Sequence, residues 1–167
     1  MTTVELWELG ARARAKVDAE SPARKKVLVM FAGECPSGPT ENMDEITHWR
    51  VVFNEDIAPV PDRPRSEEPD LGSFEVTGRT DTGELGEVVF HEAPFLENAP
   101  LTDVVTMSPV EAYKILRDKA GVTDGFQWVY LHHPVAEDHV QYRFTYDKSG
   151  RQGWSVHVDD REVKPLG

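Results

Sequence analysis

The opening segment of the chain recurs in its second half. Residues 2–7 (TTVELW) are echoed by residues 108–113 (SPVEAY), and in both segments a hydroxyl side chain stands three positions ahead of a glutamate. This spacing is typical of a capping box, which satisfies free backbone N–H groups at the start of a helix. A G-x-x-G spacing at residues 83–86 recurs at residues 150–153, each time ahead of a β-rich segment. Two signatures in the same order indicate an internal duplication.

The duplication predicts an α+β fold of two tandem units, each a helix followed by a three- or four-stranded antiparallel meander. The first unit covers residues 1–92 and contains a proline-rich insertion at residues 57–72, where four prolines stand among acids and arginines. Because proline neither continues a helix nor donates in a sheet ladder, we expect this insertion to be exposed. Residues 93–107 connect the units, and residues 108–167 form the second unit.

The second predicted helix has the clearer boundary signals. Ser108 is its expected N-cap, Pro109 fills the first helical position and Gly121 ends it. In the first helix Thr2 is the expected N-cap. The predicted apolar faces consist of Leu6, Gly10, Ala13 and Val17 in the first helix and Val110, Tyr113, Leu116 and Ala120 in the second.

Segments with the composition or alternation of strands follow each helix. Within one of them, Trp49, Val51 and Phe53 alternate with His48 and Arg50, which predicts one apolar and one mixed face. Another, residues 126–132, is apolar on both faces, so a second part of the molecule must cover it. The predicted strands are residues 26–33, 46–54, 73–79 and 87–92 in the first unit, and residues 126–132, 140–146 and 152–158 in the second.

Polar side chains alternate with apolar ones in the last two predicted strands, which places them on one face of the sheet. Together with two polar residues of the first unit they form a candidate ligand or partner surface. An exposed polar ladder without a ligand is the alternative interpretation. The candidate surface consists of His48, Arg50, Gln141, Arg143, Ser155 and His157.

The second half of the chain also resembles known families. A helix and three strands that end in residues 142–159 (YRFTYDKSGRQGWSVHVD) resemble the PepSY-like group of small domains, whose last hairpin carries an aromatic residue, Asp and Gly before a β-rich strand. Tandem helix-plus-sheet units are also similar to the beta-lactamase inhibitory protein family, in which two such units form a concave sheet that binds a target. The resemblance covers mainly residues 108–166 and implies a tandem fold with a protein-binding role. The paired cysteines and secretion signal typical of both groups are missing from this sequence.

Composition limits the compartment and the partners. Cys35 is the only cysteine, which excludes an intrachain disulfide and a zinc site built on paired cysteines. The formal net charge is -12, from 18 Lys+Arg and 30 Asp+Glu, and it repels nucleic acids and anionic membranes. Residues 1–14 mix charges with apolar side chains, unlike a signal peptide, and no stretch is long enough to span a membrane. We expect a cytoplasmic protein, unless a native signal sequence precedes these residues.

A histidine-bearing loop is the candidate metal site. His133, Glu137, Asp138 and His139 could bring imidazoles and carboxylates to one end of a hairpin, where a divalent transition metal could bind. His132 precedes His133 in a strand, so the two imidazoles should point to opposite faces. The spacing matches no established zinc signature, and a solvated polar loop is the alternative.

No catalytic signature is present. The chain has no G-x-S-x-G elbow, no Walker loop and no G-x-G-x-x-G dinucleotide fingerprint. Cys35 lies between Glu34 and Pro36, without a neighbouring cation that would activate its thiol. The sequence therefore predicts no catalytic residue and no cofactor, although catalytic groups can also converge from distant positions.

These observations favour a non-enzymatic protein-interaction module, such as an inhibitor or an immunity-type antagonist of a basic partner protein. The alternative is a small-ligand binding protein or an unrecognised enzyme, with a pocket at the junction of the two units lined by His48, Arg50, Arg143 and His157. A structural homodimer subunit is a third interpretation, and the sequence leaves open whether the chain is a monomer or a homodimer.

Overall fold

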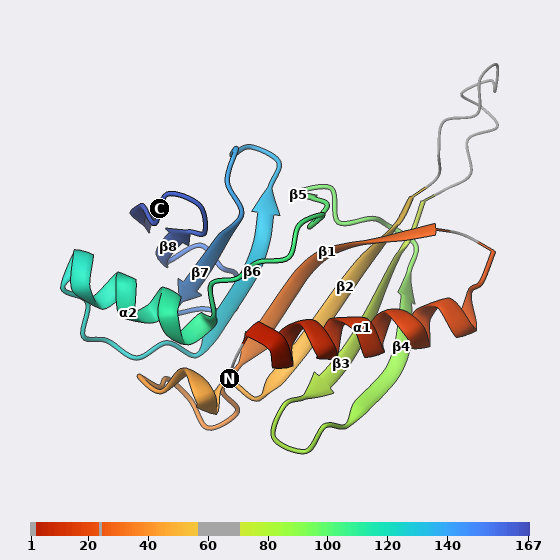
Figure 1. The fold of residues 1–167 in the computed structure, drawn as a ribbon, viewed down its shortest axis with the longest axis horizontal. Helices are drawn as coiled ribbons and strands as arrows, with labels where there is room; N and C mark the ends of the chain where they lie inside the picture. The colour runs from red at the N-terminus through yellow and green to blue at the C-terminus, as the bar shows by residue number, and fades with distance from the viewer. Residues whose placement is uncertain (1–2, 24, 57–70) are drawn as a thin grey trace.

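The computed structural model describes residues 3–23, 25–56 and 71–167 (Figure 1). Thr2, the expected first N-cap, and residues 57–70 of the expected insertion lie outside the described residues. The helices are α1 (Thr3–Glu20) and α2 (Pro109–Ala120), with a short 3-10 helix, η1 (Met43–Glu45). The strands are β1 (Lys25–Glu34), β2 (His48–Asp56), β3 (Ser73–Arg79), β4 (Leu85–His91), β5 (Asn98–Ala99), β6 (Trp128–Pro134), β7 (Gln141–Thr145), β8 (Gly153–His157) and β9 (Val163–Leu166).

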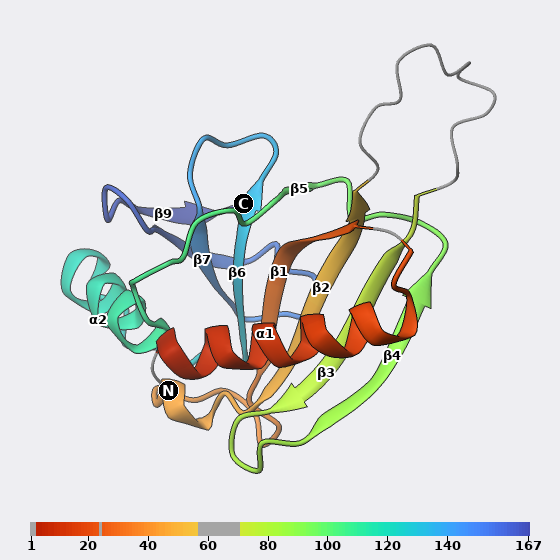
Figure 2. The same cartoon turned by 45° about the vertical axis from the view of Figure 1, so that its right-hand side comes forward.

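The described strands form one antiparallel sheet in the order β4-β3-β2-β1-β6-β7-β8-β9, with β5 paired to β6 beside this path. The prediction of two tandem helix-plus-meander units is therefore wrong. β1 pairs with β6 from Met30↔His132 to Glu34↔Trp128, so the sheet continues without a break from the first half of the chain into the second. The coarser prediction, an α+β protein with an antiparallel sheet, is confirmed (Figure 2).

Burial explains why the two halves join. Residues 28–33 of β1 and residues 129–132 of β6 are buried without alternation. Strands that are apolar on both faces belong in the interior of a sheet, because at an edge they would offer an unpaired hydrophobic backbone to other chains. The β1–β6 pair removes both edges at once and makes these two strands the centre of the sheet.

Both helices pack on the same face of the sheet, the helix face. Phe31 is opposite Leu131 and Leu131 is opposite Tyr142, so these three side chains share a face. They belong to one buried cluster that also includes Leu6 of α1 and Leu116 of α2, so a single core runs beneath both helices. The opposite face, the open face, carries a smaller apolar cluster of Val29, Met30, Ala32, Val52 and Tyr130.

The predicted apolar face of α1 is confirmed, since Leu6, Ala13 and Val17 are buried in the core. Gly10 allows the helix to approach β1 closely. A Cβ at this position would lie 2.8 Å from the Phe31 ring, a distance that real Cβ contacts do not reach. The mixed face of β2 is also as predicted, because His48 and Arg50 are half-buried on the open face.

The predicted boundaries of α2 are confirmed in detail. Ser108 Oγ accepts a 3.0 Å hydrogen bond from Glu111 N, and Gly121 ends the helix in the left-handed region at φ 66°. The predicted apolar stripe is partly wrong, because Val110 is 43% exposed. Ala112 and Ile115 are buried in its place.

Two short strands escaped prediction. β5 lies within the expected connection, residues 93–107. This connection is also bonded to β1 and α1: Leu101 N donates to Leu28 O at 2.8 Å, and Trp7 Nε1 donates to Val105 O at 3.0 Å. β9 contains Pro165 and shows no alternation in sequence. Because β9 is an edge strand, a missing N–H is tolerated there.

Cys35 is buried where the chain leaves β1, with 1% of its surface exposed. Its backbone N–H donates to the carbonyl of Gln127 at 2.9 Å, just ahead of β6. Its Sγ lies 3.3 Å from Ser37 Oγ. The thiol is thus enclosed at the end of the β1–β6 pair.

Candidate functional site

A row of side chains crosses the open face. Arg50 of β2 is opposite Ala32 of β1, Ala32 is opposite Tyr130 of β6, and Tyr130 is opposite Arg143 of β7. Residues opposite each other in an antiparallel pair point to the same face. Ala32 is small, so a hollow remains between the longer side chains of Arg50 and Tyr130. This row is the floor of a groove.

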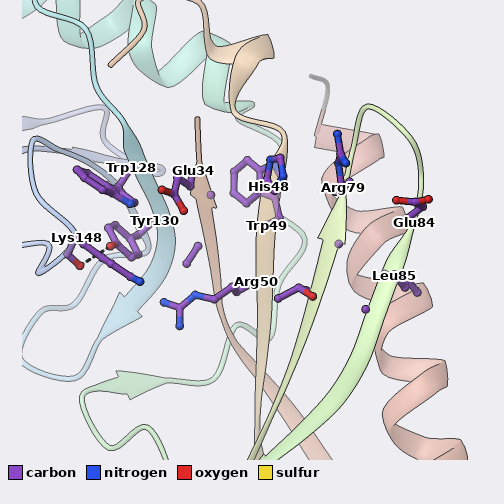
Figure 3. Close-up of a pocket in the computed structure, with 15 residues that line it drawn as sticks. Glu34, His48, Trp49, Arg50, Arg79, Glu84, Leu85, Trp128, Tyr130 and Lys148 are labelled. Carbon is purple, nitrogen blue, oxygen red and sulfur yellow. Dashed lines mark hydrogen bonds between the residues drawn. The ribbon is translucent and has the colours of Figure 1, made fainter. Parts of the chain in front are cut away.

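Two cavities meet above this row. The first has a volume of about 550 Å³ and extends to the turn between β3 and β4 (Figure 3). The second has a volume of about 600 Å³ and extends to residues 134–136 and β5. We name the two together the open-face groove. Arg50, Tyr130 and Lys148 line both cavities, and in Figure 3 Arg50 extends from β2 toward the other two.

Tyr130 fixes one wall of the groove. Its hydroxyl donates a 2.9 Å hydrogen bond to the backbone carbonyl of Lys148, in the turn between β7 and β8. Burial raises the pKa of Tyr130, so the phenol stays protonated at neutral pH. Beside it lies Trp128, whose Nε1 is buried and has no hydrogen-bond acceptor within the part of the chain that the structure describes.

The groove is richer in cations than in anions, in contrast to the chain as a whole. Arg50 lies 3.4 Å from Glu75, and Arg143 lies 3.7 Å from Glu137. Burial lowers the pKa of Arg143, but a guanidinium remains charged at neutral pH. Lys148 has no ion pair among the described residues. The charged lining residues are Arg50, Arg79, Arg143 and Lys148 against Glu34, Glu84 and Glu97.

Only part of the sequence-predicted ligand surface lines the groove. His48, Arg50 and Arg143 line the groove, whereas His157, the fourth residue of the expected junction pocket, does not. The other members share the open face but lie outside the groove lining and are almost fully buried: Gln141 at 0%, Ser155 at 3% and His157 at 0% exposed.

A polar bridge explains the burial of Gln141. With its amide nitrogen toward Glu137, it donates to Glu137 Oε2 at 2.9 Å and accepts from Arg143 Nε at 2.8 Å. The loop that carries Glu137 therefore lies against this end of the open face. An exposed polar ladder, the alternative interpretation from sequence, does not describe these side chains.

The sequence-predicted metal residues do not assemble as expected. His133 Nε2 lies 3.0 Å from the backbone oxygen of Glu137, and Asp138 is exposed. His139 instead makes an ion pair with Asp159, with 2.8 Å between Nδ1 and Oδ2, which raises the pKa of His139. His132 lines the second cavity, and its Nδ1 lies 2.6 Å from Asn98 Oδ1.

Several groove residues were missed by sequence reasoning. Trp128 and Tyr130 belong to the segment that was expected to be covered on both faces, yet both line the groove. Ala32 and Lys148 carried no functional expectation. The useful signal was the two-sided apolar character of residues 126–132, since one face of that strand must be covered by something other than the helices.

Comparisons with known proteins show little likeness. No family model and no curated protein matches the chain. A crystal structure of a protein from Clostridium difficile 630, described as a candidate lipoprotein, is similar over 94% of this chain and 90% of that chain, with 11% sequence identity and a TM-score of 0.49. Within the described residues, neither helix combines the length and the hydropathy that crossing a bilayer requires.

Proposed function

We propose that this chain is a binding protein that holds a small anionic ligand, with a carboxylate or phosphate group, in the open-face groove. The observation that carries the proposal is the meeting of two cavities at Arg50, Tyr130 and Lys148. Their volumes, about 550 and about 600 Å³, are within the range of small-molecule sites. The groove lies over the β1–β6 pair, where a rigid sheet centre holds its floor in place.

The charges of the lining support an anionic ligand. Arg50 is only weakly engaged by Glu75 at 3.4 Å, so most of its five N–H donors remain for a ligand. A guanidinium presents these donors in a plane that fits carboxylate and phosphate oxygens. Lys148 adds a second cation at the same point. Because the chain carries a net charge of -12, a lining with four cations against three carboxylates favours an anion here over other parts of the surface.

The aromatic wall supports a ligand with a planar apolar part. Trp128 and Tyr130 stand side by side along β6 on the open face, and both border the first cavity (Figure 3). Aromatic rings favour offset stacking with planar groups. An anion held by Arg50 would lie close to these rings, so the groove suits a compound that carries both features.

A ligand screen tests this proposal. Thermal shift with a panel of aromatic carboxylates and phosphate esters, from benzoate to phenyl phosphate, should find compounds that raise the melting temperature, since a ligand stabilises the state that binds it. For the strongest of them, calorimetric titration should give one site per chain. Arg50→Gln should weaken binding about 10-fold or more, because a hydrogen bond to a charged group contributes about 1.5–3 kcal/mol.

Arg151→Gln is the matched control, because Arg151 is an exposed arginine that lines neither cavity. It should bind as tightly as the unchanged protein. The proposal fails if no compound in the panel binds, or if Arg50→Gln and Arg151→Gln have equal affinities.

A second candidate function is protein binding at the edge of the sheet formed by β4. β4 ends the strand order, and its Val89 and Phe90 are 49% and 52% exposed. An exposed hydrophobic edge can accept a strand of another chain. The acidic surface favours a basic partner, as for an inhibitor or an immunity-type antagonist, whereas a self-complementary edge would give a homodimer.

Val89→Lys separates these outcomes, because an edge lysine blocks strand pairing. A mass in sedimentation that rises with concentration in the unchanged protein and not in the variant supports a homodimer. Binding to a purified basic partner that weakens with salt and is lost in Val89→Lys supports the interaction module. A strict monomer whose binding survives the substitution argues against the β4 edge.

A further inference from the structure

A second cluster of polar side chains lies away from the groove, at the end of β8. It brings together His139, His157, Asp159 and Asp160, and one donor atom from each lies within 4.8 Å of all the others. His139 comes from the loop before β7, whereas the two aspartates lie in the turn between β8 and β9. We propose that these four residues form a binding site for a divalent transition-metal ion, with Zn²⁺ as the best-matched metal.

The state of His157 points to a ligand. Its side chain is 0% exposed, and neither ring nitrogen makes a hydrogen bond with any described residue. Nδ1 faces Asp160 Oδ1 at 3.3 Å without hydrogen-bond geometry, and Nε2 lies 3.8 Å from Glu137 Oε2. A buried polar group without a partner is unfavourable. Coordination of a metal through one ring nitrogen removes that cost for that nitrogen.

Two carboxylates of the cluster have no lysine or arginine partner among the described residues. Glu137 and Glu162 also border His157, but each has a cation of its own: Arg143 lies 3.7 Å from Glu137, and Lys164 lies 3.5 Å from Glu162. The carboxylates of Asp159 and Asp160 face only imidazoles among the described ion pairs. A dication would balance these two carboxylates.

Donor chemistry selects the metal. Two imidazoles with two carboxylates suit Zn²⁺, whereas Ca²⁺ and Mg²⁺ prefer oxygen ligands throughout. A tetrahedral zinc site with bonds of about 2.0–2.1 Å needs donor atoms roughly 3.3 Å apart. The widest donor separation in the cluster, up to 4.8 Å, is therefore up to about 1.5 Å too large. Asp159 and Asp160 can close it, since their side chains are 61% and 46% exposed.

The imidazoles must move as well. The rings of His139 and His157 are stacked, with centroids 4.3 Å apart and an interplanar angle of 16°. Two nearly parallel rings cannot direct their lone pairs at one ion. Metal binding thus requires that the half-exposed His139 tilt away from His157, which stays fixed in β8. Loss of the stacking is a specific structural sign of the bound state.

Calorimetric titration of ZnCl₂ into the full, tag-free chain tests the proposal. We expect one Zn²⁺ per chain, and no saturable binding of CaCl₂ at the same concentrations. Asp159→Asn and Asp160→Asn should each weaken Zn²⁺ binding about 10-fold or more, as changes to a metal's ligand environment do. Both side chains are exposed, so these variants should fold. Asp138→Asn is the matched control, because Asp138 is an exposed aspartate next to His139 in sequence but outside the cluster.

A second measurement follows the imidazoles themselves. In ¹H–¹⁵N spectra of the histidine side chains, Zn²⁺ should shift the ring resonances of His139 and His157 and leave those of His48 and His91 in place. The proposal is overturned if no site saturates, if the three asparagine variants bind Zn²⁺ equally well, or if the shifted resonances belong to other histidines.

Discussion

The hydroxyl of Tyr130 donates to the backbone carbonyl of Lys148 across 2.9 Å, which ties the turn between β7 and β8 to the central strand of the sheet. This single bond positions a wall of the open-face groove, because residues 148–150 line its second cavity. The groove therefore depends on a contact between residues that are 18 positions apart in the chain.

Tyr130→Phe should remove this bond and keep the ring. We expect the free energy of unfolding to fall by about 1 kcal/mol, the usual net contribution of a hydrogen bond of this kind. Urea denaturation measures the change. Tyr146→Phe is the control, since the Tyr146 hydroxyl bonds to Asp124 Oδ2 at the surface and should contribute less. A larger loss in Tyr146→Phe would contradict the role assigned to Tyr130.

Gly153→Ala should be among the most damaging single substitutions in the second half. Gly153 has φ 144°, and a Cβ there would lie 2.0 Å from the carbonyl oxygen of Phe144. We expect a loss of roughly 2 kcal/mol or more, because both the backbone conformation and the β7–β8 pairing must change. Gly121→Ala, at φ 66° with nothing within 4 Å, should cost only about 1 kcal/mol. Thermal or urea denaturation measures both losses. If the two variants lost equal stability, the backbone near Gly153 would have shifted to make space for the Cβ at little cost.

Unfolding should occur in one transition, because one core runs beneath both helices. Trp49 reports on the first half of that core and Trp154 on the second. Tryptophan fluorescence of Trp49→Phe and Trp154→Phe variants, compared with far-UV circular dichroism, should give matching midpoints within each variant. Leu131→Ala, at the β1–β6 pair, should lower stability by about 2–5 kcal/mol in one step. Two separate transitions would indicate halves that fold independently.

Stability should fall with acid partly through His132. Burial, with a smaller contribution from the charge of Arg143, lowers the pKa of His132 from 6.5 to about 3. The folded protein thus keeps this imidazole neutral below pH 6.5, where the unfolded chain binds a proton. Above pH 6.5 both states are neutral at this position, so His132 does not lower the free energy of unfolding. Below pH 6.5 the free energy of unfolding falls by about 1.4 kcal/mol per pH unit as the pH approaches 3.

His132→Gln isolates this contribution. Between pH 7 and pH 5 the variant should lose about 2 kcal/mol less stability than the unchanged protein, as measured by urea denaturation at both pH values. His91→Gln, a change at an exposed histidine whose Nε2 lies 3.4 Å from Glu75 Oε2, should keep most of the acid loss that His132→Gln removes. An equal loss in all three proteins would mean that His132 takes up its proton in the folded state.

The sequence was most informative where local physics decides the outcome. The caps of α2 follow from Ser108 and Gly121, whose side-chain and backbone chemistry act within one turn. The faces of β2 follow from the alternation of Trp49 with Arg50, since strand geometry fixes that period.

Such local patterns do not predict which strands pair over long distances in the sequence. Residues 163–166 form β9 only because β8 offers a free edge, and the β1–β6 pair joins residues about 100 positions apart. The burial of His157 depends on loops that approach from both sides, so alternation alone predicted a polar surface residue there. For the same reason the cluster of His139 with Asp159 and Asp160 could not be recognised from ligand spacing.

Cys35 gives the molecule an intrinsic reporter. It is the only thiol in the chain and is enclosed where β1 leaves the centre of the sheet, so a thiol reagent can reach it only after that region opens. The rate of labelling in native buffer therefore measures how often this end of the β1–β6 pair opens, at a single known residue and without any substitution.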